Sequence, residues 1–226
     1  MVNPICKTIE VRAKDTVPFS CNRCGNCCRH VAESVMLEPL DAYRLARFLR
    51  GRGEVESVTE VLDKYTGPVI LDYGYPVFAL NTAGLTQTCV FLVDNRCRIY
   101  EARPRVCRLY PFTVDQGTRG RDFQFLQCID NNAGHFGAGR TSVKDWMYEN
   151  FSKEARQYFL LECGALARTG QLYGALSEAE RRDILFTLLH YRYFNYDLDQ
   201  PFLEQYKQNQ ATLEKLLREM TGGDAV

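Results

Sequence analysis

Apolar residues recur every three or four positions in five segments of the chain, a spacing that places them on one face of an α-helix. Two of these segments lie in the first half, and three long ones follow towards the C-terminus. The pattern therefore predicts five helices, over Pro39–Arg50, Ser57–Tyr65, Val143–Thr169, Ser177–Tyr193 and Pro201–Met220.

Several residues at the edges of these segments are typical of helix ends. Pro39 suits the first turn of the first helix, and Gly51 follows its last residue. Ser177 stands three residues before Glu180, which is the spacing of a capping box. These signals fix the expected bounds of the first and fourth helices.

Shorter stretches show the alternation of a β-strand. The residues Ile5–Val11 predict a single strand near the N-terminus. Polar turn residues between apolar runs predict two hairpins further on. The hairpins are Cys89–Tyr100, with its turn at Asp94-Asn95, and the pair Phe112–Val114 and Phe123–Leu126.

The character of the chain changes near residue 140. Nine of the ten cysteines precede residue 129, whereas the residues after 140 form long amphipathic patterns with few Gly or Pro. The Gly-rich stretch Asn131–Arg140 is the expected joint. We predict a cysteine-rich metal-binding region over 1–140 and a helical region over 141–226 that packs against it. The expected fold class is mainly α, with small β-hairpins around a cysteine-rich metal core and a C-terminal helical bundle on that core.

Composition and charge exclude several classes of protein. Hydrophobic residues make up 46% of the 226, so a packed core is expected. The 28 basic residues equal the 28 acidic ones, and we therefore expect neither nucleic acid nor an anionic membrane as a partner. No window approaches the roughly 20 apolar residues of a membrane span, and residues 1–20 contain no signal-peptide core. These observations predict a cytoplasmic protein, whose thiols stay reduced and serve metal binding or catalysis.

The densest chemical signal is a motif of four cysteines, Cys21, Cys24, Cys27 and Cys28. Gaps of two residues let successive thiolates turn back on one centre, and Gly25 permits the tight turn. The first three cysteines have the spacing of a bacterial ferredoxin run. The next ferredoxin position is occupied by Val31, so a further ligand must come from elsewhere.

Further thiols follow that can complete the site. Eight thiolates suit two four-coordinate metals, and neighbouring side chains tend to diverge, so Cys27 and Cys28 are expected to face different metals. Cys163 lies within a predicted helix and is expected to pack in the core. The predicted metal ligands are Cys21, Cys24, Cys27, Cys28, Cys89, Cys97, Cys107 and Cys128.

The surroundings of the cysteines favour iron over zinc. Histidine is almost absent, although His30 could replace a thiolate, and an all-thiolate set suits an iron–sulfur cluster of the 4Fe-4S type. All-thiolate zinc stays open. Nearby arginines can offset the negative charge of such a site. They are Arg23, Arg29, Arg96, Arg98, Arg103, Arg105 and Arg108.

Two blocks of the chain resemble the CxxCxxCC cysteine-cluster family of YkgJ-type proteins, which are described as zinc- or iron-chelating. One block is Phe19–Arg29 (FSCNRCGNCCR), followed by Leu-Glu-Pro-Leu-Asp at Leu37–Asp41. The other is Cys89–Phe112 (CVFLVDNRCRIYEARPRVCRLYPF). The resemblance covers roughly residues 15–130 and implies metal chelation without a settled reaction. Flagellin lysine N-methylases carry a related cluster, which implies protein modification as one role, but no S-adenosylmethionine site of a familiar type is visible.

Three classes of function remain open from the sequence. The first is a metal protein with iron–sulfur clusters on eight cysteines and a redox or protein-modifying role. The second is a zinc-binding structural or interaction module, and the third is a metal chelator or carrier. The sequence names no catalytic residue, substrate or protein partner, and does not decide whether the protein is an enzyme.

Overall fold

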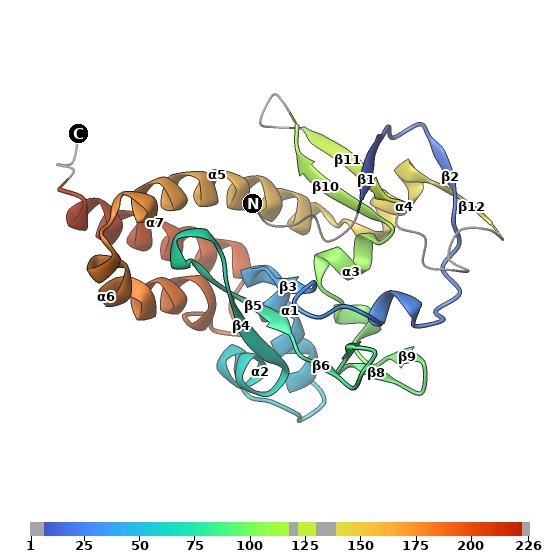
Figure 1. Ribbon diagram of the computed structural model, residues 1–226, viewed down its shortest axis with the longest axis horizontal. Coiled ribbons are helices and arrows are strands. Elements are labelled where there is room, and N and C mark those ends of the chain that lie inside the picture. Colours follow the sequence, from blue (N-terminus) through green and yellow to red (C-terminus); the bar gives the residue numbers. More distant parts are fainter. Residues whose placement is uncertain (1–6, 118–121, 130–138, 223–226) are drawn as a thin grey trace.

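The computed structural model describes residues 7–117, 122–129 and 139–222. In this part of the chain, seven α-helices accompany short antiparallel strands (Figure 1). Helices α5, α6 and α7 form one end of the molecule, and a small sheet with α4 forms the other (Figure 1). The first residues of the predicted strand Ile5–Val11, and most of the joint Asn131–Arg140, lie outside the described residues.

The two helices predicted in the first half are confirmed. Helix α1 spans Pro39–Arg50 and turns eight of its residues into the core. Helix α2 spans Val58–Tyr65, and the Ser57 side chain before it accepts a hydrogen bond from the Glu60 amide. That bond satisfies one of the free amides at the helix start.

The first of the three C-terminal helices is two helices, so the prediction of one helix over Val143–Thr169 is wrong. Phe151 is buried in a non-helical conformation, and the Ser152 side chain accepts a hydrogen bond from the Ala155 amide to begin a new helix. The cap and the buried aromatic ring outweigh continuous helix formation here. The helices of this half are α4 (Val143–Asn150), α5 (Lys153–Ala175), α6 (Glu178–Leu189) and α7 (Phe202–Met220).

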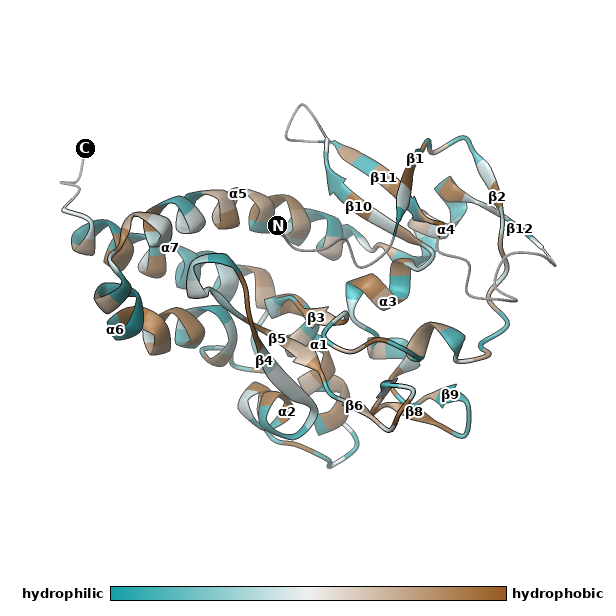
Figure 2. Cartoon of the chain, in the orientation of Figure 1, coloured by the Kyte–Doolittle hydropathy of each residue, from teal (hydrophilic) through white to brown (hydrophobic). Residues whose placement is uncertain are grey.

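Helix α6 begins as predicted and ends in an irregular turn. Ser177 and Glu180 form both bonds of the capping box. The helix continues into a π-helical segment, η4 (His190–Phe194), which buries Arg192 and Tyr193. Figure 2 shows hydrophobic and hydrophilic residues interspersed along α5, α6 and α7.

A three-stranded antiparallel sheet contains the second predicted hairpin. The hairpin is confirmed, and both of its strands extend beyond the predicted residues. The strand order is β1–β11–β10. The strands are β1 (Thr8–Val11), β10 (Phe112–Gln116) and β11 (Phe123–Cys128), with β2 (Thr16–Pro18) and β12 (Arg140–Ser142) pairing beside them.

A second sheet, which the alternation did not predict, packs beside α1 and α2. Its central strand pairs with both neighbours in antiparallel register. Pro68 and Pro76 lie within its strands, and proline weakens a strand prediction. The strands are β3 (Met36–Leu37), β5 (Pro76–Leu80) and β4 (Thr66–Ile70), with a 3-10 turn η2 (Asp72–Gly74) between the last two.

The cysteine-rich segments fold into very short elements. Asp94 and Asn95 have φ values of 50° and 58°, which form the tight turn of the first predicted hairpin. That hairpin is shorter than predicted, because Cys89 pairs with a separate strand. The elements are η1 (Asn26–Cys28), β6 (Thr82–Ala83), β7 (Thr88–Cys89), β8 (Leu92–Val93), β9 (Arg96–Cys97), η3 (Tyr100–Ala102) and α3 (Arg105–Leu109).

The main hydrophobic core draws residues from both halves of the chain. Leu45 and Leu109 belong to the same buried cluster as Phe159 and Tyr206. A smaller cluster lies among the helices α5, α6 and α7. The expected combination of helices, small antiparallel strand pairs and a C-terminal helical region is confirmed, while the division at residue 140 stays a prediction. In the described part of the chain, every helix is too short or too polar to cross a membrane.

Candidate metal centre

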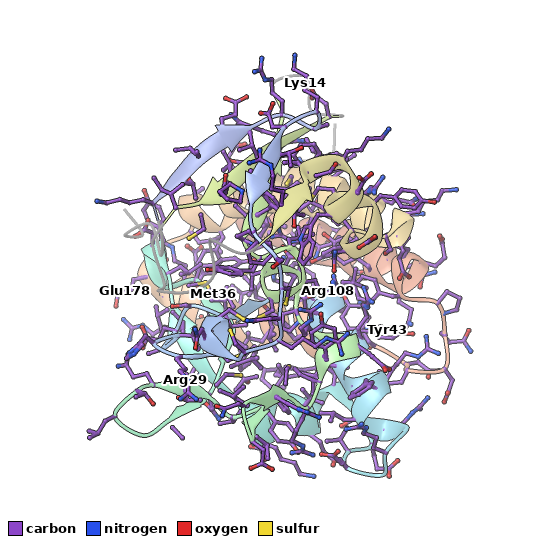
Figure 3. All side chains as sticks on the ribbon, turned by 90° about the vertical axis from the view of Figure 1, so that its right-hand side faces the viewer. Lys14, Arg29, Met36, Tyr43, Arg108 and Glu178 are labelled. Carbon is purple, nitrogen blue, oxygen red and sulfur yellow. The ribbon has the colours of Figure 1, made fainter. Side chains whose placement is uncertain are left out.

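Seven cysteines from three separate parts of the chain line one pocket. The pocket has a volume of about 60 Å³, enough for a few small atoms at about 10–15 Å³ for each water-sized one. In Figure 3, sulfur atoms gather near the middle of the molecule, in the area between the labels of Met36 and Arg108. The lining cysteines are Cys21, Cys24, Cys27, Cys28, Cys89, Cys97 and Cys107.

A glycine brings the first cysteine segment under the β8–β9 hairpin. Gly25 has a φ of +75°, a conformation that favours glycine. A Cβ atom at this position would lie 2.8 Å from Cδ1 of Leu92. The Cys28 amide donates to the Gly25 carbonyl at 3.0 Å, which starts the turn η1. A side chain at this position would therefore require Leu92 to shift.

Cys27 and Cys28 lie together instead of pointing apart. The Cys28 thiol donates a hydrogen bond to the Cys27 sulfur, and this bond is the main reason that the pKa of Cys27 falls to about 7. Burial opposes the fall, and the Arg103 guanidinium assists it. The same hydrogen bond, followed by burial, raises the pKa of Cys28. This geometry differs from the expectation that adjacent side chains diverge.

The other three inner thiols are held in protonated form by their surroundings. Burial is the largest cause that raises the pKa values of Cys89, Cys97 and Cys107, and repulsion from Cys27 adds to it. The backbone amides of Phe91 and Ile99 partly oppose this by hydrogen bonding to Cys89 and Cys97 respectively. A metal cation that binds here must displace protons, so its affinity rises with pH.

The remaining two lining cysteines lie nearer the solvent. Cys21 is exposed and Cys24 is partly exposed, on a segment without regular structure. Among the described residues, no three His, Cys, Asp or Glu side chains are already arranged around one point. The pocket thus gathers the donors without a finished coordination sphere.

The chemistry of the donors fits zinc or iron. The described lining contains seven thiols and no imidazole, and soft thiolates select these metals. His30 is exposed, and its amide donates to the Thr86 carbonyl at 2.8 Å. Its side chain is absent from the described pocket lining, so the thiols are the better candidates.

A comparison with protein families agrees with this donor set. The family model CxxCxxCC, described as a "putative zinc- or iron-chelating domain", matches residues 20–133, half of the chain. The chain belongs to the CxxCxxCC family. The matched part holds every cysteine from Cys21 to Cys128. No curated protein and no solved structure matches this CxxCxxCC chain.

The arginines of this CxxCxxCC protein divide into two groups. Arg23 and Arg103 line the pocket, with their guanidinium carbons 4.3 Å and 3.7 Å from the centre of the Tyr100 ring. Others are engaged elsewhere. Arg98 pairs with Glu54 at 2.8 Å, and Arg29 donates to Asn95 at 2.6 Å. Only part of the arginine group is therefore placed to balance charge on the cysteines.

Two acidic residues that the sequence did not single out as part of the site hold the helix that carries Cys107. Arg105 donates to both carboxylate oxygens of Glu38, with the shortest N–O distance at 2.6 Å. The Arg105 amide donates to Asp41 at 2.9 Å. Both acids lie in the Leu-Glu-Pro-Leu-Asp block at the start of α1. That block was the available signal, because it follows the cysteine motif closely in the sequence.

Two cysteines, Cys128 and Cys163, lie away from the pocket. Cys128 ends β11, pairs with Thr8, and is absent from the described lining. Its amide donates to the Pro111 carbonyl at 2.8 Å. Cys163 lies on α5 and packs against the main core. The structure thus brings together seven of the eight proposed ligands.

Proposed function

We propose that the cysteine pocket of this CxxCxxCC protein holds iron, as an iron–sulfur cluster bound through thiolates. The observation that carries the proposal is the convergence of seven cysteines from three chain segments on one pocket. Membership of a zinc- or iron-chelating family supports metal binding as the broader function. Iron–sulfur is favoured over zinc because the described lining holds many thiols and no imidazole.

The proposed ligands have distinct tasks. Cys27 interacts with each of the other inner thiols and ionises most easily, so it is the first to accept a metal. Cys28, Cys89, Cys97 and Cys107 complete the inner set. Cys21 and Cys24 lie on the irregular segment and close the site from the solvent side. Cys128 is the eighth ligand predicted from the sequence, and its position on β11 makes it the first to test separately.

Other residues of the chain prepare the pocket for an anionic cluster. Arg103 lowers the pKa values of Cys27 and Cys97 by its charge, and its Nε donates to the Tyr100 carbonyl at 2.9 Å. Amide hydrogen bonds to Cys89 and Cys97 favour their thiolate forms. A bound iron–sulfur cluster supplies electron transfer, which is the basis of the proposed redox or protein-modifying role.

The test is metal analysis of the full chain prepared without oxygen. We expect a brown protein with iron and acid-labile sulfide in similar amounts. Cys27→Ser should lose most of the iron, whereas the control Cys163→Ser should keep it, because Cys163 lies on α5 away from the pocket. Cys128→Ser decides whether the eighth cysteine belongs to the ligand set. A wild-type protein without iron or sulfide would contradict the proposal.

A zinc-bound structural or interaction module is the second candidate. Its supporting observation is the shortness of the elements around the pocket, since β7, β8 and β9 have two residues each. Such elements gain order from metal bonds. A colourless, folded protein with stoichiometric zinc, which unfolds when a chelator removes the metal, would favour this candidate.

A further inference from the structure

A second, more open hollow adjoins the cysteine pocket. Its volume is about 390 Å³, within the range of small-molecule sites of about 300–1,000 Å³. Four of its lining residues also line the cysteine pocket, and Arg96 adds a further guanidinium. The described lining is Asn22, Arg23, Arg96, Cys97 and Tyr100.

The hollow carries positive charge that has no described acidic partner. Arg23 and Arg96 are both exposed, and among the described residues neither forms an ion pair. Neighbouring arginines behave differently, since Arg98 pairs with Glu54 and Arg105 with Glu38. Arg23 and Arg96 therefore differ from Arg98 and Arg105 in having no ion-pair partner among the described residues.

The guanidinium of Arg23 is also held in place. It lies 4.3 Å from the centre of the Tyr100 ring, a cation–π contact. Arg103 lies against the same ring at 3.7 Å and fixes it further through a bond to the Tyr100 carbonyl. A held guanidinium loses less conformational freedom when it binds a ligand, and its fork of donors matches a planar or tetrahedral oxyanion.

We propose that this hollow binds the oxyanion group, carboxylate or phosphate, of a small molecule that acts at the metal centre. This proposal rests on the proposed function in one respect. Cys97 lines both the hollow and the cysteine pocket, so a molecule bound in the hollow would lie beside the proposed metal. Arg23 and Arg96 supply charge-assisted hydrogen bonds, and the Asn22 amide supplies a neutral donor. If the arginines served only to balance the charge of the cluster, an added oxyanion would find no site.

The test is calorimetric titration of the full metal-loaded chain with inorganic phosphate and, separately, with succinate, at constant ionic strength. Saturable binding of at least one is expected, and the two arms decide which oxyanion is preferred. Arg23→Gln and Arg96→Gln should each weaken binding by about tenfold or more. Arg182→Gln is the control, because Arg182 is an exposed residue of α6 that pairs with Glu178.

The outcomes separate this inference from the proposed function. Arg96→Gln should keep the wild-type metal content, since Arg96 is absent from the described lining of the cysteine pocket. Metal-loaded protein that binds neither anion would overturn the inference and leave the metal proposal intact. An equal loss of binding in Arg182→Gln would also overturn it, by showing an effect of net charge alone. If the purified chain holds no metal and still binds an oxyanion saturably, the missing metal would contradict the proposed function, while the hollow would still be a binding site.

Discussion

Two adjacent thiols at the cysteine pocket differ sharply in how easily they lose a proton. Cys28 donates to Cys27, which lowers the pKa of Cys27 to about 7 and raises that of Cys28. A fraction of Cys27 is therefore thiolate at neutral pH, before any metal arrives. This asymmetry makes Cys27 the more acidic thiol of the pair.

Behind the pocket, Asp41 is buried with one carboxylate oxygen that has no described hydrogen-bond partner. Burial, followed by the charge of Glu38, raises its pKa to about 6, although Arg108 and Arg105 oppose the shift. The folded chain thus keeps a proton that the unfolded chain releases near pH 4. The resulting stabilisation is complete below about pH 4 and is lost as the pH rises through about 6.

We expect Asp41→Asn to remove this pH dependence. When the pH rises from 4.5 to 7, the wild type should lose on the order of 2 kcal/mol of its free energy of unfolding through Asp41. The variant should not show this loss. Urea unfolding at both pH values measures the difference, and effects of the shared thiols cancel between the two proteins. The same change with pH in both proteins would show that Asp41 is not the group involved.

At the scale of single residues, sequence spacing could indicate the candidate cysteines but not the residues that surround them in the fold. The motif and the later thiols indicated a metal centre because thiolates at short gaps converge on one site. The partners of the arginines were invisible, since Glu38 pairs with Arg105 across 67 positions. Cys128 was grouped with the rest because eight thiols suit two four-coordinate metals, whereas β11 carries it into the sheet.

Among the elements, the turn η1 depends on Gly25 most directly. Its φ of +75° disfavours other residues, and a side chain here would crowd Leu92. Gly53 offers a matched control, with a φ of +70° and nothing within 4 Å of the position that a Cβ would take. The two glycines share the backbone conformation and differ in the contact.

Gly53→Ala should lower the free energy of unfolding by about 1 kcal/mol, the cost of the left-handed conformation, and Gly25→Ala should lower it further, because its Cβ would also crowd Leu92. Only Gly25→Ala should also reduce the metal content, because it displaces the segment that carries Cys24 and Cys27. Urea unfolding and metal analysis of both variants measure these effects. Full metal content in Gly25→Ala would mean that this turn does not position the ligands.

The elements differ in how well the sequence predicted them. Helix α1 and the capping box of α6 were predicted because a periodic apolar face and its end signals agreed. The break at Phe151 was missed, since burial of its ring is a tertiary effect. The β4–β5 hairpin was missed because prolines obscured its alternation. Its turn also uses Tyr73 at a φ of 59°, which the sequence does not signal.

Across the whole molecule, a buried polar group joins the C-terminal helices to one another. Arg192 of η4 pairs with Glu162 of α5 at 2.6 Å, and both side chains are almost fully buried. The Tyr206 hydroxyl of α7 donates to the same carboxylate. Nearby, the Tyr193 hydroxyl donates to the Leu37 carbonyl of β3 at 3.0 Å, which links the helices to the cysteine-rich half.

Replacing Arg192 by Leu should destabilise the protein by about 3–5 kcal/mol, because Glu162 would be left as a buried charge without its partner. The control Arg168→Leu removes an arginine whose side chain is 53% exposed, from its pair with Glu214, and should cost only about 0–1 kcal/mol. Urea midpoints of the two variants give the comparison. Equal losses in both would show that the buried pair does not link the helices.

X-ray absorption at the metal edge tests the central claim most directly, because it measures the first coordination shell in the intact protein. If the pocket thiolates hold the metal, the shell should consist of sulfur at about 2.3 Å, for iron or for zinc. In an iron–sulfur cluster, a second shell of iron should accompany it. A first shell dominated by nitrogen or oxygen at about 2.0–2.2 Å would contradict the account, since the pocket offers thiols as its ligands.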